Sequence, residues 1–164
     1  MDKKALFNLT YGLFVLTSKC ETKASGCIID TCIQVADNPI RLAISCANGS
    51  CTCGVVKRCG VFALNILDES CTFPTICHFG YQSGREVDKF HDVKILTDLN
   101  GVPYLIEETC AVISCRVEDS KNLGSHTLFI GEVVDAMLLS SKKPLSYAEY
   151  LARIKPAAEV ITPC

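Results

Sequence analysis

Residues 48–52 form a short polar segment whose side chains suit the binding of an anion. Its sequence is Asn-Gly-Ser-Cys-Thr, and it stands directly before a predicted helix over residues 51–59. Ser50 is a suitable N-cap, and Gly60 is a suitable left-handed residue after the last turn. The free N–H groups of the first turn would then point toward hydroxyl groups, which is an arrangement that binds phosphate. The alternative is an ordinary capped helix with a polar N-terminus.

Two well-known nucleotide-binding patterns are absent from the sequence. It contains neither a G-x-G-x-x-G segment nor the Walker pattern G-x-x-x-x-G-K-[ST]. Neither a Rossmann dinucleotide site nor a P-loop is therefore expected.

A second polar segment, Gln82-Ser83-Gly84-Arg85, could also contact a phosphate. Gly84 would let the backbone approach a ligand closely, and a guanidinium can hold a phosphate through two hydrogen bonds. The alternative is a solvated loop in which Arg85 pairs with Glu86 or Asp88.

His126 is the one histidine that we consider for catalysis. It follows Gly124-Ser125 at the predicted start of a strand. An imidazole can donate or accept a proton near neutral pH, so it could orient a bound donor or move a proton. The alternative is a structural histidine at a strand end. We expect His78 and His91 to be surface or loop histidines.

Twelve cysteines in 164 residues allow three interpretations. A disulfide framework is typical of small secreted domains, which this chain does not resemble in composition. A metal site would need a second close pair beside Cys51 and Cys53, and none is present, so we predict no metal. The favoured interpretation is that most are buried free thiols that behave as small hydrophobic residues. Four of them lie in apolar strand patterns, namely Cys27, Cys46, Cys110 and Cys115.

The composition indicates one domain with a sizeable core, since 49% of the residues are hydrophobic. A net charge of −2 gives no reason to expect nucleic acid or an anionic membrane as a partner. No apolar run approaches the roughly 20 residues that a membrane span needs, and the N-terminus lacks the features of a secretory signal. We therefore expect a cytoplasmic protein.

The elements that must position these residues are mostly strands separated by turn residues, which indicates a closed or nearly closed β-barrel. A capping box at Ser146 and Glu149 predicts a short helix to about residue 154, with Leu145 and Tyr150 placed for a hydrophobic staple. Residues 70–79 are expected to hold one or two helical turns, broken by Pro74. The expected strands cover residues 13–18, 26–35, 40–46, 61–67, 94–96, 104–106, 110–118 and 127–138.

Three separated segments resemble the flavin reductase-like, FMN-binding split-barrel family. They are residues 26–67, GYQSGREVDKF at 80–90 and GSHTLFIGEVVDA at 124–136, and the likeness covers residues 13 to about 154. The most similar members are the flavoredoxins and the flavin-reductase half of high-molecular-weight rubredoxins. The resemblance implies a mainly β, six-stranded Greek-key split barrel with a few short helices over residues 1–155, a tail over 156–164, and a homodimer with the flavin near the interface.

The resemblance also implies which residues bind FMN. The strand from Cys27 would supply the ring wall, the 48–52 loop the phosphate site, and His126 the catalytic group. Cys53 stands where relatives often have histidine, and in the first helical turn we expect its thiol to be reactive and to be protected by a bound phosphate. The predicted cofactor-binding residues are Cys27, Ile28, Ile29, Asp30, Thr31, Cys32, Ala47, Asn48, Ser50, Thr52, Gln82, Ser83, Gly84 and Arg85.

Asp30 departs from the family, whose usual Asn-Thr pair is Asp30-Thr31 here. An ionised Asp30 would repel a reduced, anionic flavin, so it should either point away or hold a proton. The alternative is an exposed strand residue.

The function implied by the resemblance is an FMN-dependent oxidoreductase that passes electrons from NADH or NADPH to a free flavin or to a rubredoxin-like protein. One alternative is a flavoredoxin-like electron carrier that is reduced by a protein partner. Another is a non-redox FMN-binding protein or a cysteine-rich metal protein.

Overall fold

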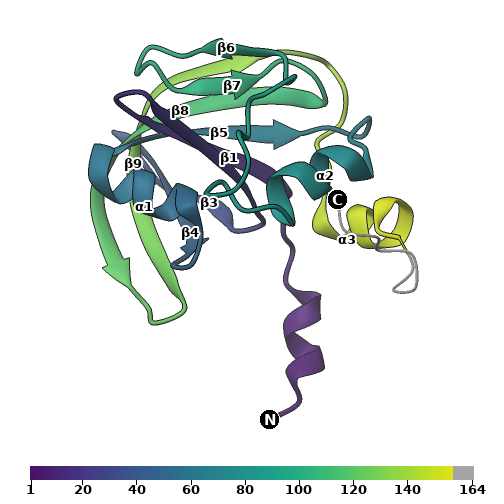
Figure 1. Cartoon of the computed structure of the whole chain (residues 1–164). Coiled ribbons are helices and arrows are strands. Elements are labelled where there is room, and N and C mark those ends of the chain that lie inside the picture. Colours follow the sequence, from purple (N-terminus) through teal and green to yellow (C-terminus); the bar gives the residue numbers. More distant parts are fainter. Residues whose placement is uncertain (157–164) are drawn as a thin grey trace.

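The computed structural model describes residues 1–156, and its main feature is a curled antiparallel sheet (Figure 1). Seven strands pair in the order β2-β1-β5-β8-β9-β4-β3, and β6 and β7 form a separate two-stranded ribbon. The strands are β1 (Phe14–Cys20), β2 (Lys23–Ile29), β3 (Cys32–Asp37), β4 (Ile40–Ala47), β5 (Val61–Leu67), β6 (Ile95–Thr97), β7 (Pro103–Leu105), β8 (Thr109–Asn122) and β9 (His126–Leu138).

The sheet confirms the mainly β split-barrel architecture, although the number of strands differs from the six expected. The single strand predicted over residues 26–35 is in fact two strands, because the chain leaves the sheet at Asp30 and Thr31. β2 and β3 consequently stand at opposite ends of the strand order, and they do not pair with each other. A backbone hydrogen bond from Ser45 N to Thr31 O, 3.3 Å long, brings this break beside β4.

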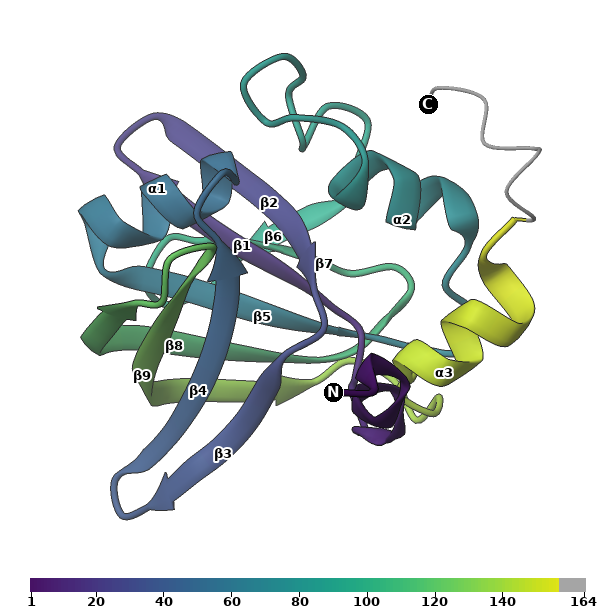
Figure 2. The same cartoon turned by 90° about the horizontal axis from the view of Figure 1, so that it is seen from below.

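The helices lie outside the barrel (Figure 2). α1 (Cys51–Cys59) packs on β1 and β2, and α2 (Phe73–Gly80) packs on β2. Pro74 was predicted to break this helix, but it does not. It stands in the first turn of α2, where a missing N–H costs no intrahelical hydrogen bond. α3 (Tyr147–Glu149) continues as a wider π-type turn, η2 (Tyr150–Ile154), and a 3-10 helix, η1 (Lys3–Asn8), precedes the barrel.

Strand alternation places the core inside the barrel. Phe62 and Leu64 of β5 are buried against Leu16, Ile44 and Phe129, because alternate residues of a strand point to the same face. Gly131 of β9 is needed beside Phe62, because an added Cβ would lie 2.8 Å from that ring. A second apolar cluster packs β1 against α2 and η2, and Leu145 and Tyr150 both belong to it, as the predicted staple requires.

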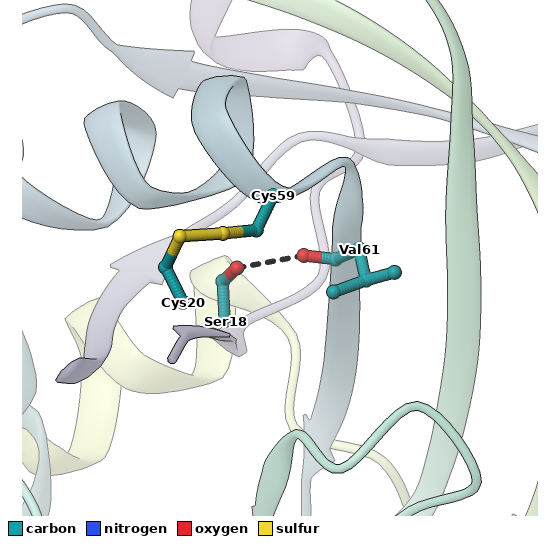
Figure 3. Close-up of a disulfide and its surroundings, with 4 residues drawn as sticks. All are labelled: Ser18, Cys20, Cys59 and Val61. Carbon is teal, nitrogen blue, oxygen red and sulfur yellow. Dashed lines mark hydrogen bonds between the residues drawn. A yellow bond between two sulfur atoms is a disulfide. The ribbon is translucent and has the colours of Figure 1, made fainter. Parts of the chain in front are cut away.

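One disulfide fastens α1 to the sheet. Cys20 at the end of β1 is bonded to Cys59 at the last position of α1, beside a hydrogen bond from Ser18 Oγ to Val61 O of 2.7 Å (Figure 3). The sequence did not indicate this pair. Eight other described cysteines are free, five of them buried, so the prediction of mostly buried free thiols is confirmed within residues 1–156.

The described residues include no helix long and apolar enough to cross a membrane. They also bring no three histidine, cysteine or acidic side chains together in a way that could hold a metal ion. The predicted domain limit at residue 155 stays a prediction, and most of the predicted tail, from residue 157 on, lies outside the described residues.

Candidate functional site

Five of the predicted phosphate-side residues, namely Ser50, Thr52, Gln82, Ser83 and Gly84, line one cavity of ≈ 340 Å³, which we call the loop cavity. It lies where the N-terminus of α1, the strand β2 and the 80–84 loop meet. Sequence segments that are far apart therefore come together as the resemblance implied. The lining residues are Gly26, Cys27, Ile28, Cys46, Ala47, Gly49, Ser50, Cys51, Thr52, Phe79, Gly80, Tyr81, Gln82, Ser83 and Gly84.

The N-terminus of α1 has the capping geometry that the sequence predicted. Ser50 has an extended backbone, and its Oγ accepts a hydrogen bond of 3.2 Å from the Thr52 N–H. The Thr52 side chain is buried, and its Oγ1 lies 2.9 Å from the Oγ of Ser25 on β2. The hydroxyl groups of Ser50 and Thr52 and the first-turn N–H groups thus meet at the positive end of the helix, where an anion is favoured.

Asn48 is not brought into the cavity. Its amide donates to Asn122 Oδ1 (3.0 Å) and to Gly124 O (2.7 Å), and its Oδ1 accepts from Lys57 Nζ (3.1 Å). These contacts fasten the start of α1 to the turn between β8 and β9. The Asn48 side chain therefore links α1 to the β8–β9 turn, a contact between distant segments that the sequence pattern does not reveal.

The 80–85 loop closes over the same end of α1. Arg85 Nη1 donates to Gly49 O at 3.0 Å, and within the described residues Arg85 forms no ion pair with Glu86 or Asp88. Gly84 is required by close approach, since an added Cβ would lie 2.9 Å from Ser25 Oγ. The loop cannot retreat from the cavity without breaking the contact between Arg85 and Gly49.

Lys89 holds the loop that lines this cavity, and it was not among the predicted site residues. Its side chain is almost fully buried, and its Nζ donates to Gln82 O (2.7 Å) and to His78 O. Burial lowers the pKa of Lys89, and the nearby Cys27 opposes that shift. The lysine in GYQSGREVDKF was the available signal. His78, predicted to be a surface or loop residue, lies in α2, and its Nε2 is 3.0 Å from Lys89 O.

A second cavity, of ≈ 430 Å³, adjoins the first, and we call it the strand-end cavity. Ile28 and Ala47 line both cavities, so the two adjoin at β2 and the end of β4. The strand-end cavity is lined by Leu13, Ile28, Ile29, Asp30, Thr31, Ser45, Ala47, His126 and Tyr147.

Pairing of β4 with β9 explains how His126 reaches the strand-end cavity. The register places His126 opposite Ala47, and the hydroxyl of Ser125 lies 2.9 Å from His126 Nδ1. Asp30 lines the same cavity, and its Oδ1 accepts a hydrogen bond of 2.9 Å from Thr31 Oγ1. Tyr147, which the sequence analysis assigned only to a helix, adds an aromatic side chain to the wall.

Three cysteines line the loop cavity, namely Cys27, Cys46 and Cys51. The sulfurs of Cys27 and Cys46 are 3.8 Å apart. The pKa of Cys27 is lowered to about 7, first by the hydrogen bond with Cys46, with help from Ser50, Thr52 and the charge of Lys89, while burial opposes it. The same contact with Cys27, together with burial, raises the pKa of Cys46.

Two cysteines do not lie where the sequence placed them. Cys32 lines neither cavity; it packs against the barrel core, and burial raises its pKa to about 11. Cys53 is fully buried in the core, because it lies on the inner face of α1. Burial of Cys53 contradicts the expectation of a reactive thiol there, and Cys51, two residues earlier, is the thiol that lines the cavity.

Comparison with known proteins gives the same family over almost the whole chain. A family model described as "Flavin reductase like domain" matches residues 6–153. The chain is 33% identical over 150 residues to a ferric-chelate reductase (NAD(P)H) of Archaeoglobus fulgidus, covering 92% of this chain and 89% of that one. It is also 33% identical over 150 residues to a high molecular weight rubredoxin of Moorella thermoacetica, covering 92% of this chain and 66% of that protein.

Solved structures show the same architecture. The flavin reductase PheA2 in its native state superposes with a TM-score of 0.73 at 27% identity, covering 89% of this chain and 93% of that one.

Proposed function

Because this chain belongs to the flavin reductase-like family, we propose that it is an FMN-dependent oxidoreductase that takes electrons from NADH or NADPH and passes them to a flavin or protein acceptor. The observation that carries the proposal is the pair of adjoining cavities, which share Ile28 and Ala47. One end offers anion-binding groups, the middle is apolar, and the other end carries a histidine. FMN has a phosphate, a flat ring and a reactive ring edge in that order.

The residues of the loop cavity fit the phosphate end of FMN. Ser50, Thr52 and Ser83 offer hydroxyl groups there, and the N-terminus of α1 offers backbone N–H groups. The guanidinium of Arg85 and the ammonium of Lys89 supply positive charge nearby. Gln82 and Gly84 complete the wall that closes over this end, whereas Asn48 is left out of the proposed site.

The gap between β2 and β4 fits the flavin ring. Ile28 and Ala47, which line both cavities, provide the apolar surface, with Cys27 on one side and Ile29 on the other. The backbone leaves the sheet at Asp30 and Thr31, and we propose that the Asp30 backbone meets the ring edge, since Thr31 O already accepts from Ser45 N. Cys32 is left out of the proposed site because it faces the core.

We propose that His126 acts on the nucleotide side of the ring. It is exposed, and it lines the strand-end cavity with Asp30 and Tyr147. We assign it the role of orienting the nicotinamide or of moving a proton at the reacting edge. When bound, FMN supplies the hydride-accepting and electron-passing chemistry, and the protein supplies binding and orientation.

The acceptor is proposed as a free flavin, a ferric chelate or a small redox protein. The names of the ferric-chelate reductase and the rubredoxin relative support these classes. An acceptor could approach the strand-end cavity from solvent, since the exposed His126 lines it.

We further propose a homodimer that pairs through the β3–β4 hairpin. β3 is an edge strand, and three large apolar side chains are exposed on the hairpin, namely Ile33, Val35 and Ile40. An unpaired edge with exposed apolar residues is a surface that a partner usually covers. The hairpin begins at the Asp30-Thr31 break, so a partner would lie close to the strand-end cavity.

The test is reconstitution with FMN followed by spectroscopy. The purified chain should bind about one FMN per subunit and become yellow, with riboflavin binding more weakly because it lacks the phosphate. A protein that remains colourless after incubation with FMN would contradict the proposal. Equal affinity for FMN and riboflavin would contradict only the phosphate placement.

A further inference from the structure

The cysteines of the loop cavity include one pair in direct contact. Cys27 of β2 and Cys46 of β4 have their sulfurs 3.8 Å apart, which is van der Waals contact between two thiols. Both line the loop cavity, so a small solute that enters comes close to the pair. The two strands are not neighbours in the sheet, since β2 is one end of the strand order and β4 is next to the other end.

The surroundings of the two sulfurs differ. Cys27 is half-buried, and it lies near the hydroxyl groups of Ser50 and Thr52 and the ammonium of Lys89. Cys46 is buried at 1% exposure, and its nearest polar partners are Cys27 and its own following carbonyl, Ala47 O. Cys27 is therefore the member of the pair that is both reachable and stabilised as an anion.

We propose that Cys27 and Cys46 are a redox-active pair, with Cys27 as the attacking thiolate, Cys46 as the resolving thiol and low-molecular-weight disulfides as the oxidising substrate class. Closure would bond β2 to β4 across the gap in the split barrel. The modification would therefore act on the wall of the cavity in which the flavin phosphate is proposed to lie. The thiol chemistry itself does not depend on bound flavin.

The reaction balances as two thiol–disulfide exchanges. The Cys27 thiolate attacks one sulfur of glutathione disulfide, whose S–S bond breaks, and one glutathione thiolate leaves and takes up a proton. Cys46 then loses its proton and attacks Cys27 Sγ, which expels the second glutathione thiolate. The protein dithiol has lost two electrons, and the small disulfide has become two thiols. The sulfurs must approach from 3.8 Å to about 2 Å, so closure needs a rotation of at least one side chain.

One rival cysteine in the same cavity and one control cysteine outside it make the assignment testable. Cys51 lines the cavity as well, so a bond between Cys27 and Cys51 is the competing outcome. Cys110 of β8 is a matched control, because it is buried outside both cavities and its Sγ lies 3.5 Å from Ile66 O. Cys20 and Cys59 are already bonded.

The experiment treats the FMN-free full chain with glutathione disulfide, traps the remaining thiols by alkylation and maps the peptides. Trypsin leaves Cys27 with Cys32 in one peptide and Cys46 with Cys51 and Cys53 in another, so the bonded pair must be located by fragmentation or by a second protease. We expect a bond between Cys27 and Cys46 that reducing agent reverses. In brief alkylation of the untreated protein, Cys27 should react roughly tenfold faster than Cys46 or Cys110.

The variants separate attack from resolution. Cys46→Ser should hold glutathione on Cys27 as a stable adduct, Cys27→Ser should leave Cys46 unmodified, and Cys110→Ser should behave as the parent. An unmodified Cys27, a glutathione adduct that persists in the parent protein, or a bond between Cys27 and Cys51 would overturn the proposal. The alkylation order in the parent protein supplies the test should a variant not fold.

A parallel reaction with FMN present distinguishes this proposal from the proposed function. If both hold, FMN should slow modification of Cys27. If the bond forms equally fast with and without FMN, the proposal of a redox-active pair is supported, and the proposed position of the flavin phosphate in the loop cavity is contradicted.

Discussion

Thr52 is the side chain on which phosphate binding should depend most. Its hydroxyl is buried, lies in the loop cavity and is 2.9 Å from Ser25 Oγ. Thr52→Ala should weaken FMN binding by roughly 1–3 kcal/mol, because a charged acceptor loses a donor in a buried site. A fluorescence titration of the apoprotein with FMN measures this directly.

Thr109→Ala is the control for that measurement. Thr109 is equally buried, but its hydroxyl donates to Glu107 O at 3.1 Å, and it lines neither cavity. Its FMN affinity should be unchanged. If Thr52→Ala also retained the parent affinity, the phosphate would have to bind elsewhere.

Cys51 gives a second readout of the same placement. It is the first residue of α1, half-buried and facing the loop cavity, whereas Cys53 is enclosed in the core. Brief alkylation should label Cys51 faster in the apoprotein than in the FMN-bound protein, because the ligand covers it. Cys53 should label slowly in both. Peptide mapping checks both expectations, and equal labelling of Cys51 with and without FMN would count against a phosphate at this helix.

At the scale of single elements, α1 could be predicted almost completely. Ser50 and Gly60 act on their own neighbours in the chain, so the two ends of the helix are visible in sequence. The break between β2 and β3 was not predicted, because a single Asp30 is too weak a signal to divide an otherwise strand-forming segment, and the two halves separate by pairing with different strands, β2 with β1 and β3 with β4. The side-chain contacts of Asn48 could not be predicted for a similar reason, because its partners lie on a distant turn.

The C-terminal end of α1 yields a stability prediction. Gly60 has φ +65°, a conformation that costs an L-residue about 1–2 kcal/mol, so Gly60→Ala should lower the free energy of unfolding by about 1 kcal/mol. Gly54, in the middle of the same helix, has no atom within 4 Å of an added Cβ. Gly54→Ala should raise the free energy of unfolding by up to about 1 kcal/mol.

Urea unfolding of the two variants under identical conditions is the measurement. Changes of opposite sign are expected from the same substitution in one helix. A loss of stability in both variants would mean that the backbone at Gly54 cannot accept a side chain, contrary to the space around it.

At the scale of the whole molecule, the β3–β4 hairpin predicts self-association. The parent protein should sediment as a dimer at micromolar concentration, and Ile33→Lys should shift it toward the monomer, because a charge would be buried in the proposed interface. Leu138→Lys, on an exposed residue at the end of β9, should leave the dimer intact. A parent protein that sediments as a monomer would contradict the proposed dimer.

The residues that line the site could be predicted better than the contacts they make with one another. Residues from 27–31, 47–52 and 82–85 were expected together from the order of three motifs, and all of these that were predicted to bind the cofactor, except Asn48 and Arg85, line adjoining cavities. Lys89, Tyr147 and the contact between Cys27 and Cys46 were missed, because each depends on how the loop, α3 and the two ends of the sheet fold against one another. Such contacts between distant segments leave no local pattern.

Anaerobic mixing of the FMN-loaded protein with NADH or NADPH tests most directly whether this chain is a nucleotide-dependent reductase. Oxidised flavin absorbs visible light and reduced flavin does not, so reduction appears as rapid loss of the yellow colour in a stopped-flow trace. We predict rapid bleaching with at least one of the two nucleotides. A protein that binds FMN but keeps its colour with both nucleotides, and bleaches only with a chemical reductant or a protein partner, would contradict the reductase assignment and would indicate an electron carrier.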